Sequence, residues 1–146
     1  MSPGTTQEIK VGEVTIRFLV EGDQSAGSVA VFEADVPVGA RVPVAHSHDG
    51  YEETIYGLDG VLTWTIEGTP TNVGPGEALF IRRGAVHHFE NTGDVHARAL
   101  AIVTPGILGV DFFREVAAIL DAAAGGPPDL AAMAAVMRRH GLTPSP

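Results

Sequence analysis

The chain is 146 residues long, carries a formal net charge of −9 and contains no cysteine. The length fits one ordinary domain. The missing cysteine excludes disulfides, iron–sulfur clusters, thiolate zinc sites and cysteine nucleophiles. The acidic excess argues against nucleic acid and anionic membranes as partners, because both need a dense positive surface. Residues Met1 to Thr6 are polar and lack the basic and apolar regions of a targeting signal, so we expect a cytoplasmic protein without a membrane partner.

From about Glu8 to Pro105 the sequence consists of short β-rich runs divided by turn residues. Many short strands with regular Gly and Pro turns are typical of an all-β sandwich or barrel. The predicted strands are Val11–Val20, Ser28–Val36, Glu53–Leu58, Val61–Ile66, Ala78–Ile81, Val86–Glu90 and Ala97–Val103.

After Pro105 the spacing of apolar residues changes to a helical one. It predicts a helix over 111–120 and a second one from Leu130 to about His140. Gly125-Gly126-Pro127 divides them, and Gly141 followed by Pro144 ends the second. We therefore expect a β-barrel domain over residues 1–106 and a helical extension over 107–146 that packs on the barrel.

The segment His46-Ser47-His48 gives the first indication of chemistry. Side chains alternate between the faces of a strand, so His46 and His48 point the same way. The Asp49-Gly50 turn then reverses the chain and can bring Glu53 back beside them from the neighbouring strand. Two imidazoles and a carboxylate on one face favour a transition-metal site.

A second segment, His87-His88, lies about 40 residues further on. By alternation, His87 shares a face with Phe89 and Asn91, whereas His88 shares one with a charged residue. We therefore predict that His87 points inward as a further ligand candidate and that His88 points outward.

These two segments resemble the two sequence motifs of the cupin superfamily. The first motif, Gly-x5-His-x-His-x3,4-Glu-x6-Gly, is matched by His46, His48, Glu53 and Gly60, although Gly39 lies one residue further from His46 than the pattern has it. The second motif, Gly-x5-Pro-x-Gly-x2-His-x3-Asn, is matched by Gly76, Gly84, His87 and Asn91, with Arg82 in place of the proline.

The resemblance, closest to small single-domain cupins of the quercetinase-like type, implies a jelly-roll β-barrel and one divalent metal ion. The implied ligands are His46, His48, Glu53 and His87, and the implied ion is Fe, Mn, Ni, Zn or Cu. It further implies dioxygenase chemistry on a small organic molecule, with Glu53 as a catalytic base, and a homodimer. Isomerase, decarboxylase and lyase activities stay open, as does a non-catalytic role in binding or sensing a small ligand.

Four further residues are candidates for a substrate pocket: Arg41, Tyr56, Trp64 and Phe89. Pockets are largely apolar with a few polar groups, which favours the aromatic residues. The alternative is that these aromatic side chains only fill the barrel core. Arg41 could pair with an anionic substrate or with the acidic residues of the chain itself.

Overall fold

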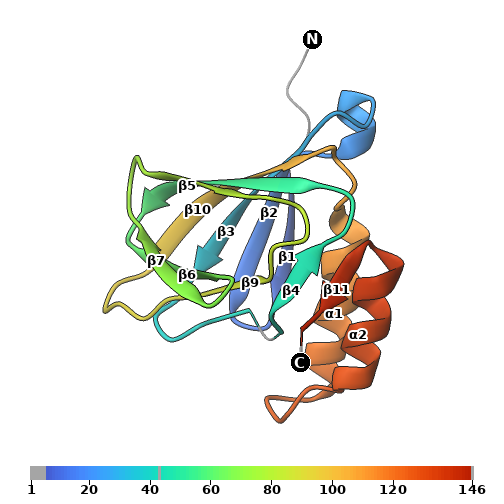
Figure 1. Cartoon of the computed structure of the whole chain (residues 1–146). Helices are drawn as coiled ribbons and strands as arrows, with labels where there is room; N and C mark the ends of the chain where they lie inside the picture. Colours follow the sequence, from blue (N-terminus) through green and yellow to red (C-terminus); the bar gives the residue numbers. More distant parts are fainter. Residues whose placement is uncertain (1–5, 43, 146) are drawn as a thin grey trace.

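The computed structural model describes residues 6–42 and 44–145, which form two antiparallel β-sheets followed by two helices (Figure 1). The prediction of an all-β jelly-roll body with two C-terminal helices is confirmed. The larger sheet has the order β1 (Gln7–Val11), β2 (Val14–Val20), β3 (Ala30–Val36), β10 (Ala97–Thr104), β5 (Glu52–Asp59) and β8 (Ala78–Ile81). The smaller sheet has the order β11 (Leu142–Pro144), β4 (His46–His48), β9 (His87–Glu90), β6 (Leu62–Ile66) and β7 (Thr69–Val73).

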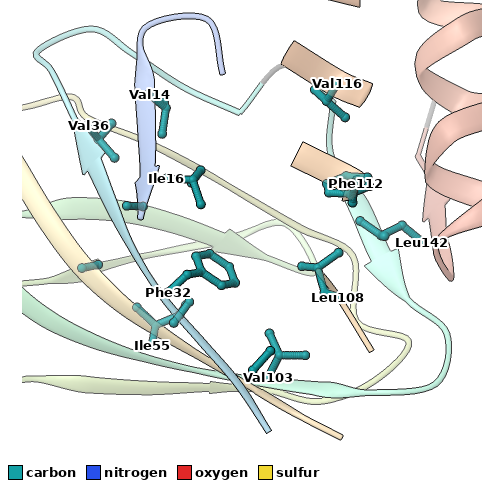
Figure 2. Close-up of a cluster of buried hydrophobic side chains, with 14 of the residues drawn as sticks. Val14, Ile16, Phe32, Val36, Ile55, Val103, Leu108, Phe112, Val116 and Leu142 are labelled. Carbon is teal, nitrogen blue, oxygen red and sulfur yellow. The ribbon is translucent and has the colours of Figure 1, made fainter. Parts of the chain in front are cut away.

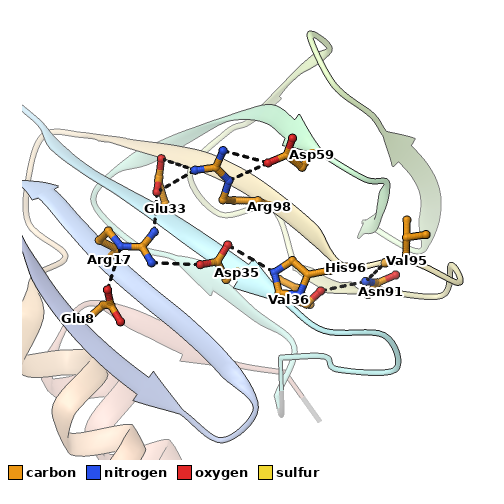
Figure 3. A network of polar contacts seen from close by, with 10 residues as sticks. All are labelled: Glu8, Arg17, Glu33, Asp35, Val36, Asp59, Asn91, Val95, His96 and Arg98. Carbon is orange, nitrogen blue, oxygen red and sulfur yellow. Dashed lines mark hydrogen bonds and ion pairs between the residues drawn. The ribbon is translucent and has the colours of Figure 1, made fainter.

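Polar side chains cover part of the outer face of the larger sheet (Figure 3). Arg17 on β2 donates to Glu33 at 2.8 Å and to Asp35 at 3.3 Å, both on β3. Arg98 on β10 pairs with the same Glu33 at 3.3 Å and with Asp59 on β5 at 2.9 Å. The two guanidinium groups thus link four neighbouring strands and neutralise part of the acidic excess on this face.

Gly60, the last glycine of the first motif, forms the turn between β5 and β6 at φ +63°. A Cβ atom at this position would lie 2.4 Å from the carbonyl oxygen of His96. Only glycine fits, because both the left-handed backbone and the close approach exclude a side chain. The motif glycine therefore fixes the turn by which the chain passes from the Glu53 strand to β6 of the other sheet.

Helices α1 (Val110–Ala122) and α2 (Leu130–Arg139) lie together, α1 beside β1 and α2 beside β11 (Figure 1). Phe113 of α1 packs against Phe18 and Phe32, with ring centroids 5.7 and 5.1 Å away. Phe112 joins the barrel core beside Leu108 (Figure 2). The helical residues thus continue the hydrophobic core of the barrel. Neither helix in the described ranges is long and apolar enough to cross a membrane.

Three strands differ from the sequence-based expectation. The run 11–20 is part of a hairpin, because Gly12 at φ +62° separates β1 from β2. Strand β7 was not predicted, since four of its five residues are exposed and it contains Pro70. Strand β11 was not predicted either, and it matters for the site. After α2 ends at Arg139, the chain turns at His140 and Gly141 and then pairs with β4, so that Leu142 lies opposite His48 and Pro144 opposite His46.

Candidate metal centre

Three histidine side chains converge between the two sheets. His46 and His48 come from β4, and His87 lies opposite His46 on the adjacent strand β9. One ligand nitrogen of each ring lies within 4.8 Å of the others. This cluster follows from alternation along β4 and from the register between β4 and β9, because both place the three rings on the inner face.

Backbone carbonyl groups fix the protonation of two of these rings. The Nδ1 atom of His46 lies 3.0 Å from the carbonyl oxygen of Val44, and that of His87 lies 2.9 Å from the carbonyl oxygen of Ala85. A carbonyl can only accept, so Nδ1 carries the proton and donates it in both bonds. The lone pair of each Nε2 is therefore free to bind a metal ion.

Burial keeps the three imidazoles neutral. Desolvation, followed by the neighbouring His87, lowers the pKa of His46 from 6.5 to about 4 and that of His48 to about 2. Desolvation also lowers the pKa of His87. A protonated imidazole cannot bind a metal ion, so these shifts leave the nitrogen lone pairs available near neutral pH.

Glu53 adds a buried carboxyl group to the cluster. Its side chain is 8% exposed, and its Oε1 lies 3.8 Å from Nε2 of His87. Burial raises the pKa of Glu53 from 4.5 to about 7. The carboxyl group reaches the histidines from β5 of the larger sheet, not from a neighbouring strand as expected, because residues 49–51 cross from one sheet to the other.

His48 and Tyr51 form a stacked pair beside this cluster, with ring centroids 4.5 Å apart. Within the described ranges, neither Nδ1 of His48 nor the hydroxyl group of Tyr51 has a hydrogen-bond partner, although both are buried. Such unpaired groups are costly unless a ligand or water satisfies them. The three imidazole nitrogens lie within 4.8 Å of one another, and the Glu53 carboxylate lies outside that group, 3.8 Å from His87 Nε2. Three imidazoles with a carboxylate beside them suit a divalent transition-metal ion better than the oxygen-preferring Mg²⁺ or Ca²⁺.

A cavity of about 100 Å³ borders these residues and extends between the sheets toward the helices. Of the four candidate pocket residues, Arg41, Trp64 and Phe89 line it. Tyr56 does not, contrary to the expectation. It alternates with the inward residues Glu53 and Ile55 on β5, so its side chain points outward and is 41% exposed.

Other cavity residues were missed by the sequence reasoning. His88 is half-buried and borders the cavity, although it was expected to point outward. The C-terminal extension contributes side chains far from the motifs in sequence. These are Phe112, Phe113, Val116, Met133, Met137 and Leu142. The helical spacing of Phe113, Val116, Met133 and Met137 indicated a buried face but not the surface against which it packs.

Residues 32–103, which include all four residues of the cluster, match the protein family described as Cupin domain. The protein is a cupin. This confirms the resemblance drawn from the two motifs, and the strand order around the histidines agrees with it.

Two curated cupin relatives are similar to this chain. Quercetin 2,3-dioxygenase of Bacillus subtilis is 25% identical over 80% of the chain and 34% of its own length. The tetracenomycin polyketide synthase protein TcmJ of Streptomyces glaucescens is 33% identical over 56% of the chain and 55% of its own length. The chain thus spans about a third and about half of these relatives.

Solved structures of similar fold come from several activity classes. The polyketide cyclase RemF of Streptomyces resistomycificus has a TM-score of 0.59 and 26% identity, over 79% of this chain and 89% of its own. A predicted oxalate decarboxylase of Thermotoga maritima has a TM-score of 0.64 and 24% identity, over 72% of this chain and 99% of its own. The fold is therefore shared by proteins with different reactions.

Proposed function

We propose that this cupin is a metal-dependent oxidoreductase of the dioxygenase type that acts on a small oxygenated aromatic molecule. The observation that carries the proposal is the cluster of three neutral imidazoles and one buried carboxyl group beside a largely apolar cavity. Sites of this kind combine a reactive polar centre with an apolar wall that binds and orients the substrate.

In this proposal His46, His48, His87 and Glu53 hold one divalent transition-metal ion. The ion supplies Lewis-acid or redox chemistry when it is bound. The backbone carbonyls of Val44 and Ala85 keep two of the rings in the ligating tautomer. In the metal-free site burial raises the pKa of Glu53 to about 7, and a bound cation would lower it. Glu53 would act as a base toward an acidic substrate hydroxyl group once its carboxylate leaves the metal ion.

The similarity to quercetin 2,3-dioxygenase over four-fifths of the chain supports an oxygen-consuming reaction. The similarity to TcmJ and to the cyclase RemF favours a second candidate, cyclisation of a polyketide-like compound without net use of oxygen. Both candidates involve an oxygenated ring system. Isomerase, decarboxylase and lyase reactions, and a purely ligand-binding role, lack a specific observation in this site.

The two candidates are separated by oxygen uptake. The protein is loaded in turn with iron, manganese, nickel or copper and mixed with quercetin and simpler polyphenols in an oxygen-electrode cell. A dioxygenase consumes oxygen as substrate disappears, and the His87→Ala variant does not. If substrates are converted equally well without oxygen, the dioxygenase assignment is wrong and cyclase chemistry is favoured. If no metal-loaded form converts any of these compounds, a non-catalytic role in binding a small ligand is favoured over both enzyme activities.

Three further expectations stay proposals. We propose a homodimer in the cytoplasm, and a functional division of the chain near residue 106. Light scattering measures the mass of the particle and tests the first. Truncation after residue 106 tests whether the barrel folds alone, and the pairing of β11 with β4 predicts that the shortened chain loses stability.

A further inference from the structure

The inner face of β10 and β3 carries three alanines beside one large residue, Phe32, which lies opposite Ala101. Along β10, Ala99 and Ala101 point inward, whereas Leu100 and Ile102 point outward. Ala34 on β3 lies directly opposite Ala99. All three alanines line the cavity. Well-packed cores avoid such gaps because each unfilled volume costs stability, so this pattern indicates space kept for a ligand.

Two aromatic rings line the same cavity from the other sheet. Trp64 on β6 lies opposite Phe89 on β9, and their ring centroids are 4.7 Å apart. Packed sheets lie about 10 Å apart, a gap that side chains of both sheets normally fill. The three alanines lie on the larger sheet and the two rings on the smaller one, and all five side chains line the same cavity. We call the five residues Ala34, Ala99, Ala101, Trp64 and Phe89 the aromatic slot.

The indole nitrogen of Trp64 supplies a polar contact within this slot. The Trp64 side chain is 5% exposed, and its Nε1–H finds no acceptor in the part of the chain that the structure describes. A buried indole N–H normally has a hydrogen-bond partner. Because Trp64 lines the cavity, an oxygen atom of a bound molecule can provide the missing acceptor.

The slot adjoins the histidine cluster. Phe89 and His87 lie on the same face of β9, two residues apart. A cavity of about 100 Å³ is somewhat smaller than the roughly 150 Å³ engineered cavity that takes up benzene. One ring is therefore the most that this cavity could take up, and a larger polyphenol would insert only one of its rings.

We propose that the aromatic slot binds a single flat ring that bears an oxygen substituent, with that oxygen accepting a hydrogen bond from Nε1 of Trp64. The ring lies between the alanines of the larger sheet and the aromatic pair of the smaller sheet. Only the orientation of the ligand toward a metal ion rests on the proposed function. The slot itself is a property of apolar and indole side chains and is present without metal.

The binding test uses phenol, benzene and cyclohexanol as probes, with both the metal-free and the zinc-loaded protein, in calorimetry and ligand-observed NMR. We expect phenol to bind more tightly than cyclohexanol, which has the same hydroxyl group on a puckered ring. Trp64→Phe keeps an aromatic ring and removes the N–H, so phenol affinity should fall about tenfold, as expected for one buried hydrogen bond. Benzene affinity should change little.

Ala99→Leu fills the slot and should abolish binding of all three probes while zinc stoichiometry stays unchanged. The matched control is Ala78→Leu, on the exposed face of β8, which should leave probe binding unchanged. If Ala99→Leu does not fold, Ala101→Val replaces it. Contacts in NMR between phenol and the methyl groups of Ala99 and Ala101 in the unmodified protein locate the ligand independently of any variant.

The outcomes separate the slot from the proposed function. If zinc binds but phenol does not bind either form, or binds without contact to these methyl groups, the slot proposal is overturned and the metal centre is untouched. Equal affinity for cyclohexanol and phenol also overturns it. If phenol occupies the slot but zinc does not bind the histidines, the slot stands and the proposed enzyme function fails.

Discussion

Zinc binding should displace about one proton from the protein at mildly acidic pH, and Glu53 should be its source. The metal-free protein is titrated with Zn²⁺ at about pH 6 and about pH 8, with Glu53→Gln as the matched variant. At each pH the titration is repeated in buffers of different ionisation enthalpy, so that calorimetry reports the number of protons released per ion bound.

The expected number follows from the pKa values of the cluster. With a pKa of about 7, the carboxyl group of Glu53 is about 0.9 protonated at pH 6 and about 0.1 protonated at pH 8. His46, with a pKa of about 4, and His48, with a pKa of about 2, are almost fully neutral at both pH values and release nothing. The protein should therefore release about 0.9 more protons than Glu53→Gln at pH 6, and about 0.1 more at pH 8.

The comparison with the variant cancels any proton lost from a metal-bound water. Release of two or three protons at pH 6 by both proteins would show that the imidazoles are charged before binding. That result would refute the argument that burial keeps them neutral. Equal release by both proteins at every pH would show that Glu53 does not ligate.

Three further predictions concern stability. Burial raises the folded-state pKa of Glu53 from 4.5 to about 7. The free energy of unfolding of the metal-free protein should therefore fall by about 3 kcal/mol relative to that of Glu53→Gln as pH rises from 4.5 through 7. Urea unfolding of both proteins at the two pH values measures this difference. Leu142→Ala should lower the free energy of unfolding by about 3 kcal/mol and weaken zinc binding, because Leu142 is buried and pairs with His48. The control Thr143→Ala, on the exposed side of β11, should lower it by less than about 1 kcal/mol. Asn91→Ala should cost about 3 kcal/mol in thermal unfolding without changing zinc stoichiometry. The Asn91 side chain donates to the carbonyl groups of Val36 and Val95, accepts from the N–H of Gly93 and does not line the cavity.

Local patterns were sufficient to predict most of the barrel and the position of the histidines. Alternation along a strand relates His46 to His48, and glycine turns such as Gly60 mark the ends of strands. The same alternation contains the signal against Tyr56, since an inward Glu53 requires an outward residue three positions later. It also contains the signal for the slot, in the inward alanines of β10.

What could not be predicted depends on tertiary packing. Leu142 belongs to a three-residue strand that ends in proline, and a segment so short has no periodic pattern. Its pairing with β4 depends on contacts between segments far apart in sequence, such as the packing of α2 against β11 and the hydrogen bond from Thr143 to Asp49. For the same reason Phe112 and Met137 could be assigned to a buried face but not to a cavity beside the histidines.

The central claim is that His46, His48, His87 and Glu53 bind one divalent metal ion. Crystals of the zinc-loaded protein, measured at the zinc absorption edge, test this claim most directly. The account predicts one strong anomalous peak per chain, within bonding distance of an imidazole nitrogen of all three histidines and of the Glu53 carboxylate. A fully loaded crystal without a peak at this position, or with peaks only at surface carboxylates, would contradict it.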